Sequence, residues 1–441
     1  MSEAQRALAR DVLAAALAAV APGAALRRHL RLEGARLFAD DAGYDLQQYR
    51  RVCVVGAGKA SGAMAAALED LLGDCIDAGL VIVKDGHRVP TRHITLREAA
   101  HPVPDARGVA ATGELVALLR DAHAEDLLVA LLSGGGSALL EQPVAGVDLA
   151  ALQATTDLLL RAGATIGEVN AVRKHLSAVK GGGLARLAAP ATVLVLALSD
   201  VLGDPLDVIA SGPFAPDPTT FADAGAVLSR YDLWERLPPT VAAHLRAGIA
   251  GQVPDTAKPG DDVFRNVRHV VVGNVAQAVE AAAARARKRE LNSLLLTSYV
   301  EGEAREVGRV LGALARELVT HGQPVPRPAC LMLGGETTVT VRGAGLGGRN
   351  QEVVLGALPS LAGLRDVLVL SAATDGGDGP TDAAGAWADG TSLARATALG
   401  LDPASALRQN DAYPFFAALD DLLNTGPTLT NVNDLMFVYA F

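Results

Sequence analysis

The run Val54-Val55-Gly56-Ala57-Gly58-Lys59-Ala60-Ser61-Gly62 decides the fold class of this 441-residue chain. A short apolar strand ends in glycines, and a helical stretch follows at once. Such a turn exposes backbone N–H groups and aims a helix N-terminus at whatever binds there, which favours a phosphate or a carboxylate. The run therefore predicts a strand–turn–helix unit with an anion-binding loop at Gly56, Gly58 and Lys59. A plain tight turn is the alternative.

The same alternation of short apolar runs and Ala/Leu-rich stretches continues along the chain. The predicted strands are 52–55, 80–83, 127–132, 192–198, 269–272, 293–297, 329–333 and 367–371. The predicted helices are 60–72, 107–122, 149–161, 276–289, 305–320 and 351–361. Strands that are apolar throughout indicate sheets covered on both faces. We therefore predict an α/β fold with mainly parallel sheets covered by helices.

Proline placement suggests where the chain divides. Four prolines fall within 237–262, and a second series of strand–helix units follows. We predict a Rossmann-like α/β domain over 1–236, a linker over 237–262 and a second α/β domain over 263–441, with an active-site cleft between them. The β-branched alternation at 336–342 predicts one half of a hairpin.

Composition excludes several classes of partner. Lysines and arginines number 39 against 49 acidic residues, a formal net charge of −10, and nonspecific nucleic-acid binding needs a basic surface. Three cysteines without a CxxC pair argue against a disulfide framework. The N-terminus lacks a signal pattern, and no apolar run approaches the roughly 20 residues that span a bilayer. We expect a cytoplasmic protein with small-molecule substrates and no membrane partner. A homo-oligomer is compatible with the sequence.

A second glycine loop follows the strand at 127–132. Ser133-Gly134-Gly135-Gly136-Ser137 contains three consecutive glycines, which cost conformational entropy. A simple loop needs one or two of them. Close approach of the backbone to a ligand explains all three, and the two serines add hydroxyl groups.

The stretch 170–183 is basic and ends in three glycines. On a helix, Arg173, Ser177 and Lys180 would share one face, which predicts an anion-binding surface. A solvated basic stripe is the alternative, and His175 by itself is more often structural than catalytic.

Acidic and basic residues also follow three later strands. Asp200 ends the strand at 192–198, where open α/β sheets bind ligands, so it could hold a metal, orient a hydroxyl or cap a helix. Arg349 and Asn350 begin a helix after a glycine-rich loop; an arginine there opposes the helix dipole, so a bidentate contact to a carboxylate or phosphate is expected. Asp375 and Asp378 lie in a glycine-rich turn suited to Mg²⁺, with a capping turn at Asp382 as the alternative.

These motifs together resemble the class II glycerate kinases, whose C-terminal portion is called the MOFRL domain. The resembling segments are 56–62, 101–105, 133–138, 170–183, 199–220, 334–352, 374–385 and 425–434. The resemblance covers nearly the whole chain from about residue 50. It implies phosphorylation of the 2-hydroxyl of D-glycerate by ATP with Mg²⁺, giving 2-phospho-D-glycerate and ADP.

The resemblance also implies roles for individual residues. Lys59 and Arg349 match positions that the family is thought to use in catalysis, and Asp200 and Asp375 match further acids. We assign anion binding to Arg173, Lys180, Asn350 and the 133–137 loop, proton acceptance to Asp200, and Mg²⁺ to Asp375, Asp378 or Glu336. Two alternatives stay open, an NAD(P)H-dependent hydroxypyruvate reductase and a non-enzymatic sensor of small anions.

Overall fold

The computed structural model describes residues 1–441, and the strand that precedes the first glycine loop lies in the middle of a six-stranded sheet. The sheet contains β4 (Arg51–Ala57), β5 (Ala78–Lys84), β6 (Ile94–Ala99), β7 (Asp126–Ser133), β8 (Thr192–Leu198) and β9 (Val267–Gly273). Its order is β6-β5-β4-β7-β8-β9, and the strands from β6 to β8 pair in parallel. This is the doubly wound order, in which the chain reverses its direction of travel between β4 and β7. The predicted parallel α/β sheet is confirmed.

Helices cover both faces of this sheet. Side chains of α4 (Ala106–Arg120) and α8 (Gly183–Ala188) pack on one face, in a core with alternate residues of β4, β5, β7 and β8. On the other face, α3 (Ser61–Leu72) contacts β4, β5, β6 and β7, and its Gly62 lies against Val83. The apolar runs are therefore buried on both sides, as their composition requires.

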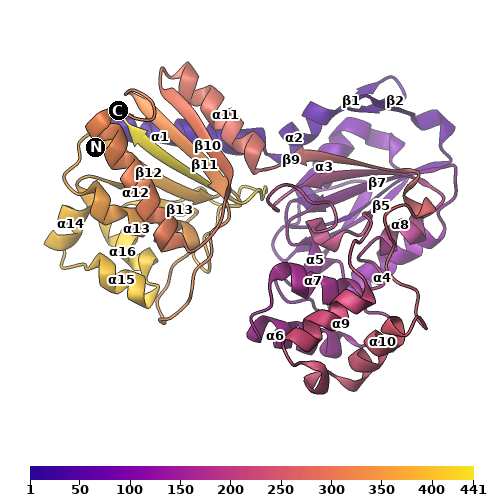
Figure 1. Ribbon diagram of the computed structural model, residues 1–441. Coiled ribbons are helices and arrows are strands. Elements are labelled where there is room, and N and C mark those ends of the chain that lie inside the picture. The colour runs from indigo at the N-terminus through magenta and orange to yellow at the C-terminus, as the bar shows by residue number, and fades with distance from the viewer. The chain divides into compact units, whose positions relative to one another are not determined.

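The remaining elements around this sheet form two smaller groups. The first is an antiparallel sheet of β1 (Leu30–Glu33), β2 (Arg36–Ala39) and β3 (Ala42–Asp45). The second is a helical cluster of α6 (Leu149–Arg161), α7 (Ile166–Lys174), α9 (Phe221–Arg230) and α10 (Pro239–Ile249), seen together in Figure 1. Helix α5 (Gly136–Leu139) is a single turn between β7 and this cluster.

The second six-stranded sheet is mixed. Its strands are β10 (Asn292–Val300), β11 (Ala329–Gly335), β12 (Val367–Ala373), β13 (Gly385–Asp389), β14 (Leu422–Leu423) and β15 (Asp434–Ala440). Strand β10 pairs with β11 in parallel, and β15 lies antiparallel between β11 and β12. Consequently β10, β11 and β12 run in one direction and end at the same edge of the sheet.

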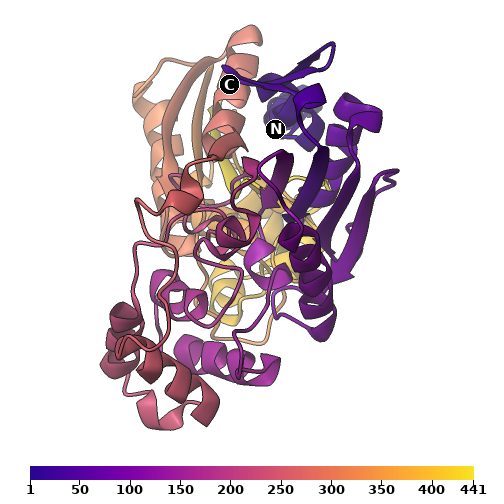
Figure 2. The ribbon, with the colours of Figure 1, turned by 90° about the vertical axis from the view of Figure 1, so that its right-hand side faces the viewer.

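Long helices also cover this second sheet. On one face α12 (Ala304–His321) and α13 (Arg349–Leu361) pack into a core with β11, β12 and β15, together with α14 (Ser392–Ala398), α15 (Pro403–Gln409) and α16 (Ala412–Leu419). Helix α11 (Val275–Lys288) contacts β10 and β11, and α1 (Glu3–Ala19) packs on α11. Figure 2 shows the same elements from a second direction.

The chain divides differently from the predicted domain boundaries. One compact unit is Ala25–Val272, and the other combines Met1–Ala24 with Gly273–Phe441. The predicted linker at 237–262 instead holds α10, whose Pro239 occupies the first helical turn, where proline is favoured. Its Val241 and Leu245 are buried in the helical cluster. Pro238 and Pro239 thus mark a helix start inside a domain.

No single helix is long and apolar enough to span a membrane; the bent pair of α1 and α2 (Pro22–His29) passes that test together, on length and composition alone.

The predicted strand at 336–342 does not form. Only Thr338 makes an isolated bridge, to Glu303, and Val341 is 75% exposed. A hairpin with β11 has no free edge to use, because β10 and β15 already occupy both sides of β11.

Candidate functional site

The two predicted glycine loops meet at the point where the doubly wound sheet reverses direction. The Lys59 N–H donates to the Gly134 carbonyl at 2.8 Å, and the Ala60 N–H donates to the Ser133 hydroxyl at 3.0 Å. Ser133 is fully buried, whereas Lys59 is half-buried. Open α/β sheets bind ligands at this position, beyond the carboxyl ends of the strands. The structure thus brings together the residues predicted from two separate motifs.

Glycine is required at two positions of this contact. Gly58 has a φ of +148°, and a Cβ there would lie 2.0 Å from the Ser133 hydroxyl oxygen. Gly135 has a φ of +83°, and a Cβ there would lie 3.0 Å from the His101 ring and 3.2 Å from Cγ of Lys59. The two loops can approach each other only without these side chains.

Arg173 reaches the 133–137 loop from α7. Its Nη2 donates to the Ser137 carbonyl at 2.8 Å, while its Nε is buried and has no hydrogen-bond partner. Burial lowers the pKa of Arg173. Asn170, one helical turn earlier, also has a buried side-chain oxygen without a partner. Arg173 also lies 3.9 Å from the Glu141 carboxylate, so this face of α7 brings a cation with one unused donor to the loop.

A strained turn supports the same loop. Ala210, Ser211 and Gly212 have consecutive φ values of +51°, +60° and +61°, a conformation that costs non-glycine residues energy and is typical of functional sites. The turn places the Ser211 hydroxyl 2.8 Å from that of Ser137 and donating to it. Because the Ser137 oxygen accepts this bond, its own O–H can point at a ligand.

The prediction of a basic helical face over 173–180 is wrong. Helix α7 ends at Lys174, so Ser177 and Lys180 lie beyond it. The Lys180 ammonium is fully buried and donates to the Leu140 carbonyl and to the Glu141 carboxylate, both at 2.7 Å. Burial lowers its pKa to about 8. Lys180 belongs to an internal ion pair and does not face a ligand.

His175 and Asp200 have different surroundings. The Nδ1 of His175 lies 2.7 Å from the Ala171 carbonyl oxygen and its Nε2 lies 2.8 Å from the Asp255 carboxylate, so the ring is structural. Asp200 is half-buried two residues after β8, at the edge where β4 and β7 also end.

A second group of polar residues gathers at one edge of the mixed sheet. Gly335 at the end of β11 pairs with Asp434 at the start of β15, and Asp434 also pairs with Ala373 at the end of β12. The segments that follow β11 and β12 carry Glu336 and Asp375. Antiparallel insertion of β15 thus brings its N-terminal residues to the loops that follow the parallel strands.

Arg349 lies in this second group, at the start of α13. Its Nε and Nη2 bind the two oxygens of Asp434 at 2.6 and 3.0 Å, and Nη1 binds Glu336. Burial raises the pKa of Asp434 to about 6, although the adjacent Arg349 acts in the opposite direction. The bidentate partner predicted for Arg349 exists, but in this structure it is a carboxylate of the protein.

The predicted metal ligands do not assemble. The Asp378 carboxylate accepts the N–H groups of Asn350 at 3.0 Å and Gln351 at 2.9 Å, so it caps α13, and burial raises its pKa. Asn350 is itself buried, between Asp378 and the Ser371 hydroxyl. No three His, Cys, Asp or Glu side chains are placed to hold a metal ion. The helix cap accounts for Asp378 and Asn350, which the sequence had suggested as metal and phosphate ligands.

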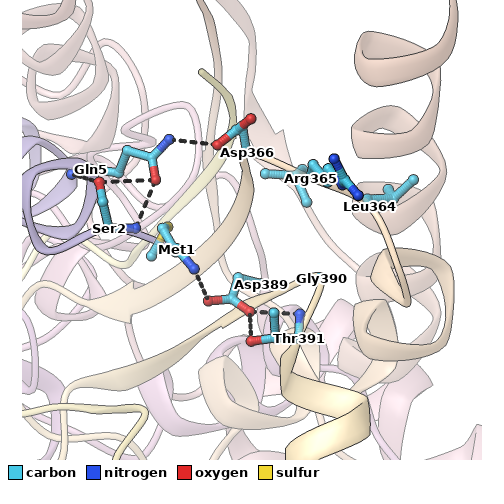
Figure 3. Close-up of a pocket in the computed structure, with 10 residues that line it drawn as sticks. Met1, Ser2, Gln5, Leu364, Arg365, Asp366, Asp389, Gly390 and Thr391 are labelled. Carbon is cyan, nitrogen blue, oxygen red and sulfur yellow. Dashed lines mark hydrogen bonds and ion pairs between the residues drawn. The ribbon is translucent and has the colours of Figure 1, made fainter.

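A pocket of about 400 Å³ lies at the opposite end of β12 (Figure 3). Asp366 and Asp389 line it, and both are hydrogen-bonded, to Gln5 and Thr391 respectively. It contains no residue of either group described above.

Two family models match the chain, a domain of unknown function (DUF4147) over residues 8–246 and the MOFRL family over residues 329–434. A glycerate 2-kinase of Pyrococcus horikoshii is 41% identical over 387 residues, covering 88% of this chain and 86% of that protein. A D-glycerate 2-kinase of Thermotoga maritima is 42% identical, covering 88% and 90%. The chain belongs to the glycerate 2-kinase family.

Solved structures agree with this membership. The crystal structure of a glycerate kinase from Thermotoga maritima superposes with a TM-score of 0.88 at 39% identity, and the match covers 100% of both chains. A similar protein from Agrobacterium vitis, 46% identical over 87% of this chain and 98% of its own, is named a putative hydroxypyruvate reductase.

Sequence reasoning missed three residues in this member of the glycerate 2-kinase family. Asn433, whose side-chain amide donates to Glu336 at 3.4 Å, and Asp434 lie at the end of the resembling segment 425–434, directly before an apolar strand, but neither was assigned a role from the sequence. Ser211 had no local signal, because left-handed backbone at a serine is not visible in sequence.

Proposed function

We propose that the chain transfers the γ-phosphoryl group of ATP to the 2-hydroxyl of D-glycerate, giving 2-phospho-D-glycerate and ADP. The observation that carries this proposal is Lys59, a cation held by two glycine loops at the reversal point of the doubly wound sheet. The curated relatives named as glycerate 2-kinases support the same substrate. A cytoplasmic location stays a prediction.

The first unit supplies donors for anionic oxygens. Phosphoryl transfer depends mainly on positioning and on stabilising negative charge. Lys59 would bind an oxygen of the transferred group, and the 133–137 loop with Arg173 would bind a further phosphate or the glycerate carboxylate. The hydroxyl O–H bond breaks and its oxygen bonds to phosphorus, while the bond to the leaving ADP oxygen breaks. Asp200 would accept the hydroxyl proton.

Arg349 would act from the second unit. Its two partners differ in burial: the Asp434 side chain is fully buried, whereas that of Glu336 is 44% exposed. We propose that Arg349 stays on Asp434 and exchanges Glu336 for an anionic ligand oxygen. Asp434 then orients the guanidinium, and Nη1 becomes the ligand-binding nitrogen.

The residues present do not form a prepared magnesium site. Glu336 is bound to Arg349 and Asp378 caps α13, which leaves Asp375 without further carboxylates positioned to share an ion. We propose that Mg²⁺ enters with the triphosphate, as such ions usually do.

The acid that a reductase would use is paired with an arginine in this structure. Dinucleotide-binding folds of this topology use an acid after the second strand to bind the ribose. Asp85 occupies that position after β5, but Arg107 holds both of its oxygens, at 2.7 and 2.8 Å. Asp85 therefore forms an ion pair with Arg107 on the protein surface.

Replacement of Asp85 tests the kinase hypothesis against the reductase hypothesis, and a kinase should show only a small change in kcat/KM. We expect Asp85→Ala to keep kcat/KM for glycerate phosphorylation within about twofold, because an exposed ion pair contributes little. Steady-state kinetics of this variant and of Arg107→Ala check it. A loss of NADH binding together with NADH-dependent activity in the wild type would favour the reductase.

The function itself is tested with purified protein in two assays. We expect ADP and 2-phosphoglycerate from D-glycerate and ATP, and no oxidation of NADH with hydroxypyruvate. Robust NADH oxidation without ADP formation would overturn the proposal.

A further inference from the structure

A histidine from a neighbouring strand contacts the backbone of Lys59. His87 lies in the turn after β5, and its Nδ1 is 2.9 Å from the Lys59 carbonyl oxygen. A carbonyl oxygen can only accept a hydrogen bond, so Nδ1 carries the proton and donates it. The ring is half-buried, and its own backbone is fixed by a bond from its N–H to the Lys84 carbonyl at 2.9 Å.

The Lys59 residue is therefore held from both sides. Its N–H donates to Gly134 in the loop after β7, and its carbonyl accepts from His87 in the loop after β5. Strands β5 and β7 flank β4, so the two neighbouring loops clamp the residue that follows the central strand. Gly58 before it has a φ that other residues rarely adopt. The Gly134 bond orients one side of the residue, and the His87 bond orients the other.

We infer that His87 is a positioning residue for Lys59, an inference that rests on the proposed role of Lys59. His87 does not bind substrate. It fixes the peptide plane from which the Lys59 side chain departs, and a displacement of about 1 Å in a catalytic group can cost 10²-fold in rate. The lysine itself contributes in the transition state, so the loss falls on kcat.

Three variants test the geometry of this bond. Asn carries its N–H donor on Cγ, as His87 carries Nδ1, whereas Gln places its donor one bond farther out and Ala has none. We expect His87→Asn to retain kcat within about threefold. His87→Ala and His87→Gln should lose about 10- to 100-fold in kcat, with KM for glycerate and ATP changed by less than about threefold. A purely structural role would lower the melting temperature without this rescue.

A double variant connects the effect to Lys59. If His87 acts through Lys59, Lys59→Ala/His87→Ala should be no slower than Lys59→Ala alone, because the two losses are not additive. His93→Ala is the matched control: it removes a half-buried histidine of the same unit that contacts Asp74 and not the loop, and kcat should not change.

The outcomes distinguish the positioning role of His87 from the proposed role of Lys59 in the reaction. Normal kcat in His87→Ala, together with a severe loss in Lys59→Ala, overturns the positioning role and leaves the proposed function intact. Normal kcat in Lys59→Ala removes the lysine from the mechanism and the inference with it. Fully additive losses in the double variant also overturn it.

Discussion

Lys59→Ala should lower kcat for glycerate phosphorylation by about 100- to 1000-fold, the usual loss when one charged contact to a transition state is removed. Stability should change little, because alanine keeps the backbone hydrogen bonds of residue 59 to Gly134 and His87. Steady-state kinetics and a thermal melt measure the two quantities.

The control for this variant is another lysine. Lys288 is exposed at the end of α11, and Lys288→Ala should leave kcat unchanged. A kcat for Lys59→Ala within threefold of the wild type would exclude the lysine from the reaction.

Arg349→Ala should lose most activity and also about 3 kcal/mol of the free energy of unfolding. Breaking a buried ion pair typically costs 3–5 kcal/mol, because the remaining charge is left without a partner. The Asp434 left behind is fully buried, but its pKa, already raised to about 6 by burial, lets it take up a proton and moderates the loss. The ion pair with Asp434 thus gives this arginine a contribution to stability besides the ligand contact that the sequence predicted.

The pKa of Asp434 determines how the loss of stability in Arg349→Ala depends on pH. A raised pKa means that the folded state binds a proton more tightly than the unfolded chain, whose Asp titrates near 3.9. Arg349 lowers the pKa of Asp434, so its removal raises that pKa further. The loss in Arg349→Ala should therefore grow as the pH rises above about 6, where the wild-type carboxyl becomes charged and paired, and should shrink as the pH falls below it. Urea unfolding at pH 5 and pH 8 measures this; an equal loss at both would contradict it.

Arg349→Lys distinguishes the effect of the positive charge from the effect of the planar guanidinium. Lysine keeps the positive charge but cannot bind both oxygens of Asp434 and a ligand in one plane, so kcat/KM should still fall by most of its value while stability falls less. Arg309→Ala, which removes an exposed arginine of α12, is the control. Near-normal activity in Arg349→Lys would exclude the planar role.

The amino-acid sequence by itself determined the local segments of this protein, its strands, helices and glycine loops. Apolar runs and their spacing located β4, β5, β7, β8 and β9 of the first sheet and the helices α3, α4 and α6, because the faces of these elements must be buried. Strand β6 was missed. Glycines at Gly58 and 134–136 marked the two loops, since only glycine allows that backbone approach. The sequence predicted Lys59 and the loop at 133–137 as parts of two separate anion-binding loops; they meet in the structure because the carboxyl ends of parallel strands share an edge.

Only the tertiary structure decided which distant segments meet. Backbone hydrogen bonds are the same for every sequence, so periodicity could not show that β15 inserts between β11 and β12 and carries Asp434 to Arg349. The same holds for the pairing of Lys180 with Glu141, 39 residues away, and for the packing of α1 on α11. An active site shared by the two units stays a prediction. The role of a charged side chain depends on the partners that folding places next to it. Lys180 is internal because the Glu141 carboxylate is buried beside it. Lys59 is half-buried at the edge of a sheet.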